Sequence, residues 1–205
     1  MFYSNYFVFT GGPGGGKSTV LREMEEMGYP TVEEAGRNII RRQTKLQGDG
    51  VPWGDRARYA RLMFLQSVMD FEQYAHLVGP CFFDRGIPDT LGYCRLVGIP
   101  LPKEYAEAAE RYRYNGTVFL FPFWEEIYIQ DVERKQDKAE AQATCRVLRE
   151  TYEALGYRIL TVPFGTPGER ARWIAGQVPL FRQKVHQDGQ HVGGKKDMHR
   201  AGVRE

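Results

Sequence analysis

Cysteine is scarce in this chain of 205 residues, with three copies at positions 81, 94 and 145 and no C-x-x-C pair. This usage excludes a disulfide scaffold or a zinc ribbon and is typical of a reducing compartment. No apolar run approaches the roughly 18 residues that a membrane span needs. The opening residues MFYSNYFVF have neither the basic start nor the long apolar stretch of a signal peptide. We therefore expect a cytoplasmic protein without a membrane partner.

Most of the chain also has no surplus of charge of one sign. The net charge is +2, from 28 basic and 26 acidic residues. Residues 183–205 hold five of the basic and three of the acidic ones, which leaves 23 of each in residues 1–182. A nucleic-acid-binding domain normally carries a basic excess on its folded body. We expect no nucleic-acid partner.

Hydrophobic periodicity predicts strands and helices in alternation. Each short apolar run is followed by glycine or proline and then by a segment with helical spacing. This alternation predicts an α/β fold with a parallel sheet covered on both faces. The strands are expected at Tyr6–Thr10, Thr31–Val32, Cys81–Asp84, Thr117–Phe121 and Tyr157–Val162, and helices at Val20–Met27, Ala35–Gln43, Arg56–Leu77, Lys103–Arg111, Asp131–Leu155 and Thr166–Gln177.

The length suits one compact domain, which we place at residues 1–182. Residues 183–205 are polar and rich in glycine. A segment of this composition buries too little apolar surface to fold by itself. It is expected to be a disordered tail.

The most specific motif is G-x-x-x-x-G-K-S at residues 11–18, the Walker A pattern, between a predicted strand and a predicted helix. Glycines let successive N–H groups point at a phosphate chain, and the following helix adds its positive end. The lysine reaches the outer phosphates, and the serine hydroxyl binds Mg²⁺. The alternative, a glycine-rich turn with an accidental lysine, does not account for this context. The predicted nucleotide-binding residues are Gly11, Gly12, Pro13, Gly14, Gly15, Gly16, Lys17, Ser18 and Thr19.

Other P-loop classes are disfavoured by motifs that the sequence lacks. There is no N-K-x-D motif of a GTP switch and no LSGGQ helix of a transporter ATPase. A ring-forming motor needs a second helical domain, for which 205 residues leave little room. A phosphotransferase or a compact NTPase remains.

Five segments together carry a family resemblance: FTGGPGGGKST, VEEAGRNII, VPWGD, FFDRGIPDTLGY and GYRILTVPFGTPGERA. They spread over about residues 6–177, and only the first is specific alone. The chain resembles the small-molecule and nucleoside kinase branch of P-loop proteins. More closely, it is similar to AAA-type ATPase/kinase domains related to the ribosylnicotinamide kinase domain of the bacterial NAD regulator. The resemblance implies a three-layer P-loop NTPase fold with a lid segment and a five-stranded parallel sheet, the P-loop strand at its centre. It also implies ATP and Mg²⁺ as cofactors.

Asp84 ends the apolar run CFFD, which places its carboxylate at the edge of the sheet where α/β proteins bind ligands. The resemblance implies that it is the Walker B acid and holds Mg²⁺ with Ser18. A strand-end turn is the alternative. Arg85 is similar to the arginine of nucleoside kinases that contacts substrate, although a surface arginine would fit as well. Asp89 is expected to cap the next helix.

Glu33, Glu34 and Arg37 follow the second predicted strand. In nucleoside kinases a carboxylate here accepts the proton of the substrate hydroxyl, and the resemblance favours Glu34 through its Glu-x-x-Arg spacing. Stabilisation by the helix dipole alone is the alternative. Glu33 and Arg37 are expected to bind substrate. Trp53 is expected either to cover the substrate or to fill the core beneath its loop.

The segment VERKQDKAEAQATCR occupies the position of the kinase lid, and the resemblance makes Arg134 the catalytic lid arginine, with Lys135 and Lys138 beside it. A solvated helix face predicts the same composition. The loop PFGTPGERA would pack on the adenine in kinases of this architecture.

These features predict an ATP- and Mg²⁺-dependent kinase of a small hydroxylated metabolite, preferably a nucleoside or a nucleoside-like compound. The alternative is a regulatory NTPase that acts through a protein partner. The sequence does not decide which of Glu33, Glu34 and Asp84 is the base. It also leaves open the choice of ATP over GTP and the oligomeric state.

Overall fold

The computed structural model describes residues 1–128 and 137–178. Its centre is a five-stranded sheet in the order β2-β3-β1-β4-β5, in which every neighbouring pair is parallel. The strand that precedes the glycine-rich loop is the middle one, as predicted. The strands are β1 Tyr6–Thr10, β2 Thr31–Val32, β3 Cys81–Asp84, β4 Thr117–Leu120 and β5 Arg158–Thr161.

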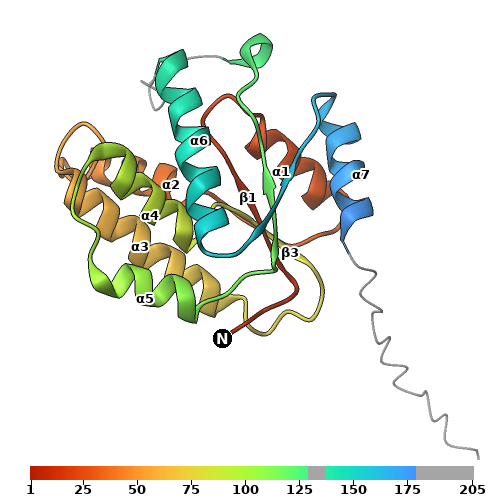
Figure 1. Cartoon of the computed structure of the whole chain (residues 1–205), viewed down its shortest axis with the longest axis horizontal. Helices are drawn as coiled ribbons and strands as arrows, with labels where there is room; N and C mark the ends of the chain where they lie inside the picture. Colours follow the sequence, from red (N-terminus) through yellow and green to blue (C-terminus); the bar gives the residue numbers. More distant parts are fainter. Residues whose placement is uncertain (129–136, 179–205) are drawn as a thin grey trace, which may run out of the picture.

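Helices cover both faces of this sheet. Figure 1 shows α1 and α7 together on one side, with α3, α4, α5 and α6 on the other. The sequence therefore predicted the α/β class and the three-layer arrangement correctly. The helices are α1 Lys17–Glu26, α2 Ala35–Lys45, α3 Arg56–Gln73, α4 Ile87–Val97, α5 Lys103–Arg111, α6 Lys138–Ala154 and α7 Pro167–Gln177, with a 3₁₀ turn η1 at Glu125–Ile127.

Two hydrophobic cores lie on the two faces of the sheet. Side chains alternate along a strand, so Tyr6 and Val8 of β1 enter one core and Phe7 and Phe9 enter the other. The first core lies under α3 to α6, and the second lies under α1 and α7. Burial on both faces explains why β1 and β3 read as almost continuous apolar runs.

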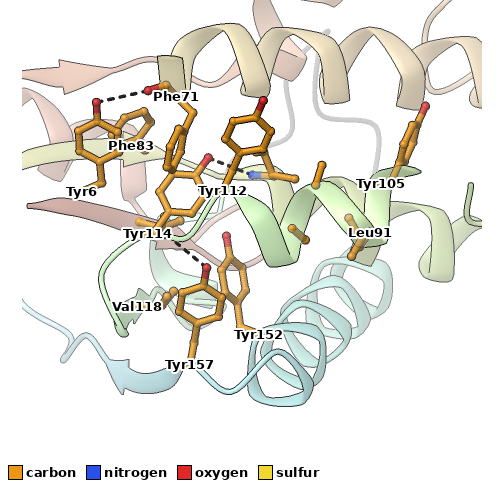
Figure 2. Packing of buried hydrophobic residues seen from close by; sticks show 14 of the residues in the cluster. Tyr6, Phe71, Phe83, Leu91, Tyr105, Tyr112, Tyr114, Val118, Tyr152 and Tyr157 are labelled. Carbon is orange, nitrogen blue, oxygen red and sulfur yellow. Dashed lines mark hydrogen bonds between the residues drawn. The ribbon is translucent and has the colours of Figure 1, made fainter. Parts of the chain in front are cut away.

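The first core is rich in tyrosines whose hydroxyl groups hold backbone in place (Figure 2). The Tyr114 hydroxyl accepts a hydrogen bond from the backbone N–H of Ile87 at 3.2 Å. The Tyr6 hydroxyl donates to the carbonyl of Phe71 at 3.3 Å, and the Tyr157 hydroxyl accepts from the N–H of Tyr114 at 3.4 Å. Buried tyrosines need such partners. The one at Ile87 fixes the start of α4, directly after β3.

Three predicted helix ends differ from the observed ones by three residues or more. Helix α1 begins at Lys17 rather than Val20, because Gly16, with a φ of 77°, is its N-cap, so Lys17 and Ser18 already lie in the first helical turn. Helix α3 ends at Gln73, four residues before the predicted end. Helix α6 begins at Lys138 rather than residue 131, because Asp137 is extended and accepts from the N–H of Glu140 at 2.8 Å as an N-cap.

Two further predictions concern membrane-spanning helices and the C-terminal tail. No helix in residues 1–128 and 137–178 combines the length and the hydropathy needed to cross a bilayer. The proposed tail at 183–205 lies outside the described residues.

Candidate active site

The loop between β1 and α1 has a shape that only glycine permits at several positions. Gly11, Gly14 and Gly16 have φ angles of 124°, 79° and 77°. A Cβ atom on Gly11 would also overlap the carbonyl oxygen of Phe121. The loop thus curls tightly between a central strand and a helix N-terminus, which is the context that a phosphate-binding loop requires.

Lys17 folds back onto this loop. Its Nζ donates to the carbonyl oxygens of Gly11 and Gly12 at 3.1 and 2.9 Å. Burial, together with the charge of Arg85, lowers the pKa of Lys17 from 10.5 to about 8. The ammonium group is therefore held close to the loop amides, where an anion would stabilise its charge.

The loop residues face different surroundings. Six of them line a cavity of about 220 Å³: Pro13, Gly14, Gly15, Gly16, Lys17 and Ser18. Gly11 and Gly12, at the start of the loop, are buried and do not line the cavity. Thr19 is exposed on the first turn of α1.

Asp84 lies beside this loop at the end of β3, where its backbone pairs with Phe9 of β1. Its Oδ2 accepts from the Ser18 hydroxyl at 3.2 Å. Its Oδ1 is buried and has no hydrogen-bond partner among the described residues. Burial and the charge of Glu34 raise the pKa of Asp84 from 3.8 to about 6, and Lys17 counteracts this shift in part. A buried carboxylate oxygen without a partner suits a cation.

Ser18 and Asp84 accordingly fit a Mg²⁺ ion. Within residues 1–128 and 137–178, no group of three or more His, Cys, Asp or Glu side chains could hold a metal. Mg²⁺ commonly takes one or two protein ligands and completes its shell with phosphate oxygens and water. These two residues meet that requirement.

Glu34 is clamped by two arginines. Arg85 Nε lies 2.9 Å from Glu34 Oε1, and Arg37 Nε lies 3.4 Å from Oε2. Burial alone would raise the pKa of Glu34, but Arg85, Lys17 and Arg37 together lower it to about 2. The carboxylate is therefore ionised throughout the physiological range. Arg85 itself has a φ of 77°, an unusual conformation for a residue with a side chain.

Asp89 joins these residues to the core. It accepts from the N–H of Gly86 at 2.9 Å, which confirms the predicted capping role. It also accepts from the hydroxyls of Thr10 at 2.7 Å and Tyr152 at 2.6 Å, and from Arg85 Nη1 at 3.0 Å. The strand end of β1, the loop after β3 and helix α6 thereby meet at one carboxylate.

The cavity extends from the phosphate loop into an apolar and aromatic space between α3 and α4. The rings of Tyr59 and Tyr93 meet edge to face at 5.4 Å. Glu33, Glu34, Arg37, Trp53, Asp84 and Arg85 all line the same cavity, so the structure brings these predicted residues together. Trp53 is 48% exposed, and the alternative that it fills the core is wrong.

The sequence reasoning missed the α3 and α4 side of the cavity. Its lining includes Tyr59 and Met63 of α3 and Tyr93 and Leu96 of α4. These residues have the spacing of ordinary core positions. No local signal separates a residue facing a cavity from one facing the core.

The predicted lid is placed only in part. Arg134 and Lys135 lie outside the described residues. Lys138 forms an exposed ion pair with Glu125. The same neighbourhood holds an aromatic pair, Trp124 and Phe164, with ring centroids 4.9 Å apart.

A family model of AAA domains matches residues 6–170. The chain belongs to this AAA-domain family. The match covers the phosphate loop, the acids of the cavity and the first turn of α7. No functionally curated protein has a sequence that matches this chain.

Several solved structures share the fold of this AAA domain. The NadR protein in complex with NR has a TM-score of 0.61 at 16% identity, over 87% of this chain and 51% of that one. The deoxyadenosine kinase from M. mycoides has a TM-score of 0.53 at 14% identity, over 84% and 97%. The shikimate kinase from Acinetobacter baumannii has a TM-score of 0.52 at 14% identity, over 85% and 92%. The chain spans about half the length of NadR. These likenesses establish a fold shared with P-loop kinases.

Proposed function

We propose that this AAA domain is an ATP- and Mg²⁺-dependent phosphotransferase acting on a small hydroxylated acceptor, preferably a nucleoside or a nucleoside-like compound. The observation that carries the proposal is the cavity of about 220 Å³ next to the phosphate loop, lined by Lys17, Glu34 and Asp84. A hydrolase needs room only for water beside the phosphates. A space lined by aromatic side chains suits a second, organic substrate.

The charges in the cavity favour an uncharged acceptor. Arg37 and Arg85 are both paired with Glu34. An acceptor bearing a phosphate or carboxylate would have to compete with Glu34 for them. The Tyr93 hydroxyl is buried without a hydrogen-bond partner among the described residues, and burial raises its pKa to about 12, so it remains a donor. This hydroxyl could donate a hydrogen bond to a polar atom of the acceptor, on a ring that packs against Tyr59.

The proposed transfer forms one bond and breaks one. The acceptor hydroxyl oxygen bonds to the γ-phosphorus of ATP, the bond from that phosphorus to the β,γ-bridging oxygen breaks, and ADP leaves. Glu34 orients the hydroxyl and takes its proton. Its low pKa does not prevent this role, because in a loose transition state the proton leaves late and positioning dominates. Lys17 and the loop amides bind the phosphates.

The metal has a defined place in this proposal. Asp84 and Ser18 would hold Mg²⁺, which when bound neutralises charge on the phosphate oxygens. The hydrogen bond between Ser18 and Asp84 already brings the two oxygens together. The unpartnered oxygen of Asp84 is the group that supports this assignment.

The test is a metabolite screen for ADP release, with the phosphorylated product identified by mass. A kinase yields ADP and phosphorylated acceptor in equal amounts. The regulatory alternative yields only slow hydrolysis that no acceptor accelerates. The control is Lys17→Ala, which should keep the fold and lose most turnover, because the side chain binds phosphate. Turnover at the parental rate in Lys17→Ala would disprove the nucleotide site.

Two further variants separate the roles of the acids. Asp84→Asn keeps the shape but removes the charge for Mg²⁺, so both transfer and background hydrolysis should collapse. Glu34→Gln should lower transfer by about 10²–10⁴-fold, the usual value of a positioned base, while the slow water reaction persists. Parental transfer in Glu34→Gln would move the base to Asp84 or Glu33. Loss of ATP·Mg²⁺ binding in Glu34→Gln would place Glu34 in the metal site instead.

A further inference from the structure

Arg170 is a buried cation that lies against the phosphate loop but, unlike Lys17, does not line the cavity proposed to bind the acceptor (the acceptor cavity). Arg170 belongs to the first turn of α7, which packs beside α1 (Figure 1), and it is only 2% exposed. Its guanidinium carbon lies 4.8 Å from the ring centroid of Phe121 and 5.7 Å from that of Trp124. A Cβ atom on Gly16 would lie 2.7 Å from Arg170 Nη1. The guanidinium is thus held by two rings against the last glycine of the loop.

The charge of this guanidinium is not balanced by the described part of the chain. Its Nε and Nη2 are buried without a hydrogen-bond partner there. The adjacent carboxylate, Glu169, is engaged by the N–H and hydroxyl of Thr166 at 2.9 and 2.7 Å. Burial lowers the pKa of Arg170 to about 10, so the group still carries its charge at neutral pH.

The place of Arg170 beside a helix N-terminus raises the free-energy cost of burying its charge. Gly16 is the N-cap of α1, and the N-terminal end of a helix carries a partial positive charge. A buried cation at that end is unfavourable unless an anion contacts both the guanidinium and the helix N-terminus. The stacking against Phe121 and Trp124 compensates only in part.

We propose that Arg170 is a nucleotide-binding residue that contacts the phosphate chain of the donor from the outer side of the loop. This inference rests on the proposed function, because it requires a nucleotide at the loop. The residues that line the acceptor cavity do not include Arg170. Since the γ-phosphate must face that cavity, the phosphates nearer the nucleoside are the ones within its reach. Arg170 would therefore hold ATP and ADP alike, without touching the acceptor.

Calorimetric titration of the full chain with ATP, ADP and adenosine tests this assignment. Arg170→Met should weaken ATP and ADP binding by about 10- to 100-fold, the usual value of hydrogen bonds to a charged group. Adenosine, which has no phosphate, should bind as it does to the parent. Arg170→Lys should recover part of the affinity. The control is Arg172→Met, an exposed arginine on the same helix, which should bind like the parent.

Melting without nucleotide separates a ligand contact from a structural support. Arg170→Met should melt no lower than the parent, because it removes a buried charge without a partner. A large drop in both Arg170→Met and Arg170→Lys would overturn the proposal in favour of a structural role. Parental ATP affinity in Arg170→Met would overturn it while the proposed function stands, and an equal loss for adenosine would overturn the phosphate contact. A parent chain that binds no nucleotide would instead overturn the proposed function, and this inference with it.

Discussion

At the residue scale, the acids around the phosphate loop differ in how many of their oxygens already accept hydrogen bonds. Both oxygens of Glu34 face arginines, and both oxygens of Asp89 accept from neighbours. Asp84 retains one buried oxygen without a partner among the described residues. The sequence could place all three near the loop, because they follow strands of a parallel sheet, and it assigned the capping role of Asp89 correctly. It could not show which carboxylate oxygens are already engaged, because their partners come from other elements.

The ion cluster around Glu34 makes a pH-dependent contribution to stability. The pKa of Glu34 in the folded protein is lowered to about 2, so the contribution is present above the ordinary value of 4.5 and is lost as the pH falls towards 2. Glu34→Gln leaves Arg85 and Arg37 without their partner and should lower the free energy of unfolding by about 2–4 kcal/mol at pH 7. The difference from the parent should shrink as the pH falls from about 4.5. Urea unfolding at several pH values measures it.

The matched control is the neighbouring residue. Glu33→Gln changes the same charge on an exposed side chain, which accepts a 3.4 Å hydrogen bond from Asn38 rather than facing two arginines. It should change the free energy of unfolding by less than about 0.5 kcal/mol. Equal effects of the two variants at pH 7 would show that the arginine clamp contributes nothing to stability.

At the element scale, strands were easier to predict than helix ends. The strands β1, β3 and β4 are almost wholly buried and read as apolar runs, and the observed bounds of all five strands differ from the predicted ones by at most a residue at either end. Helix ends depend on local caps and loops. The start of α1 follows from the backbone of Gly16, and the start of α6 follows from the side chain of Asp137. The residues that line the cavity from α3 and α4 required the packed structure.

The loop between β1 and α1 depends on glycine for a steric reason that can be tested. Gly11→Ala places a Cβ at a φ of 124° and against the carbonyl oxygen of Phe121. Both features are unfavourable, and we expect a loss of about 2–4 kcal/mol in the free energy of unfolding, together with weaker ATP binding. Chemical denaturation and nucleotide titration measure the two effects.

Gly116→Ala provides the comparison. A Cβ at Gly116 meets nothing within 4 Å, and the residue is exposed before β4. Its substitution should change stability by no more than about 0.5 kcal/mol. If Gly11→Ala were as stable as Gly116→Ala, the loop would tolerate a side chain and the steric argument would be wrong.

At the scale of the whole molecule, one continuous sheet separates the proposed acceptor site from the proposed Arg170 contact. The carboxyl ends of β1 and β3 meet at the phosphate loop, as expected for a parallel sheet. The acceptor cavity lies on the α3 and α4 side, whereas Arg170 approaches from the α7 side. The family match ends at residue 170, so it includes this arginine. The sequence predicted the central place of the loop, but the approach from α7 depends on tertiary packing.

The folded unit is proposed to end near residue 182. Residues 183–205 are polar and glycine-rich, with little apolar surface to bury. A chain ending after Arg182 should melt within about 2 °C of the full chain, which corresponds to less than about 1 kcal/mol, and should keep its nucleotide affinity. Scanning calorimetry of both chains measures the difference.

A chain ending after Gly165 is the contrasting control, because it also loses Ala171 and Ile174, which are fully buried in the second core. That chain should not fold cooperatively. A drop of many degrees on removing residues 183–205 alone would show that this segment packs against the domain, and the boundary at residue 182 would have to be abandoned.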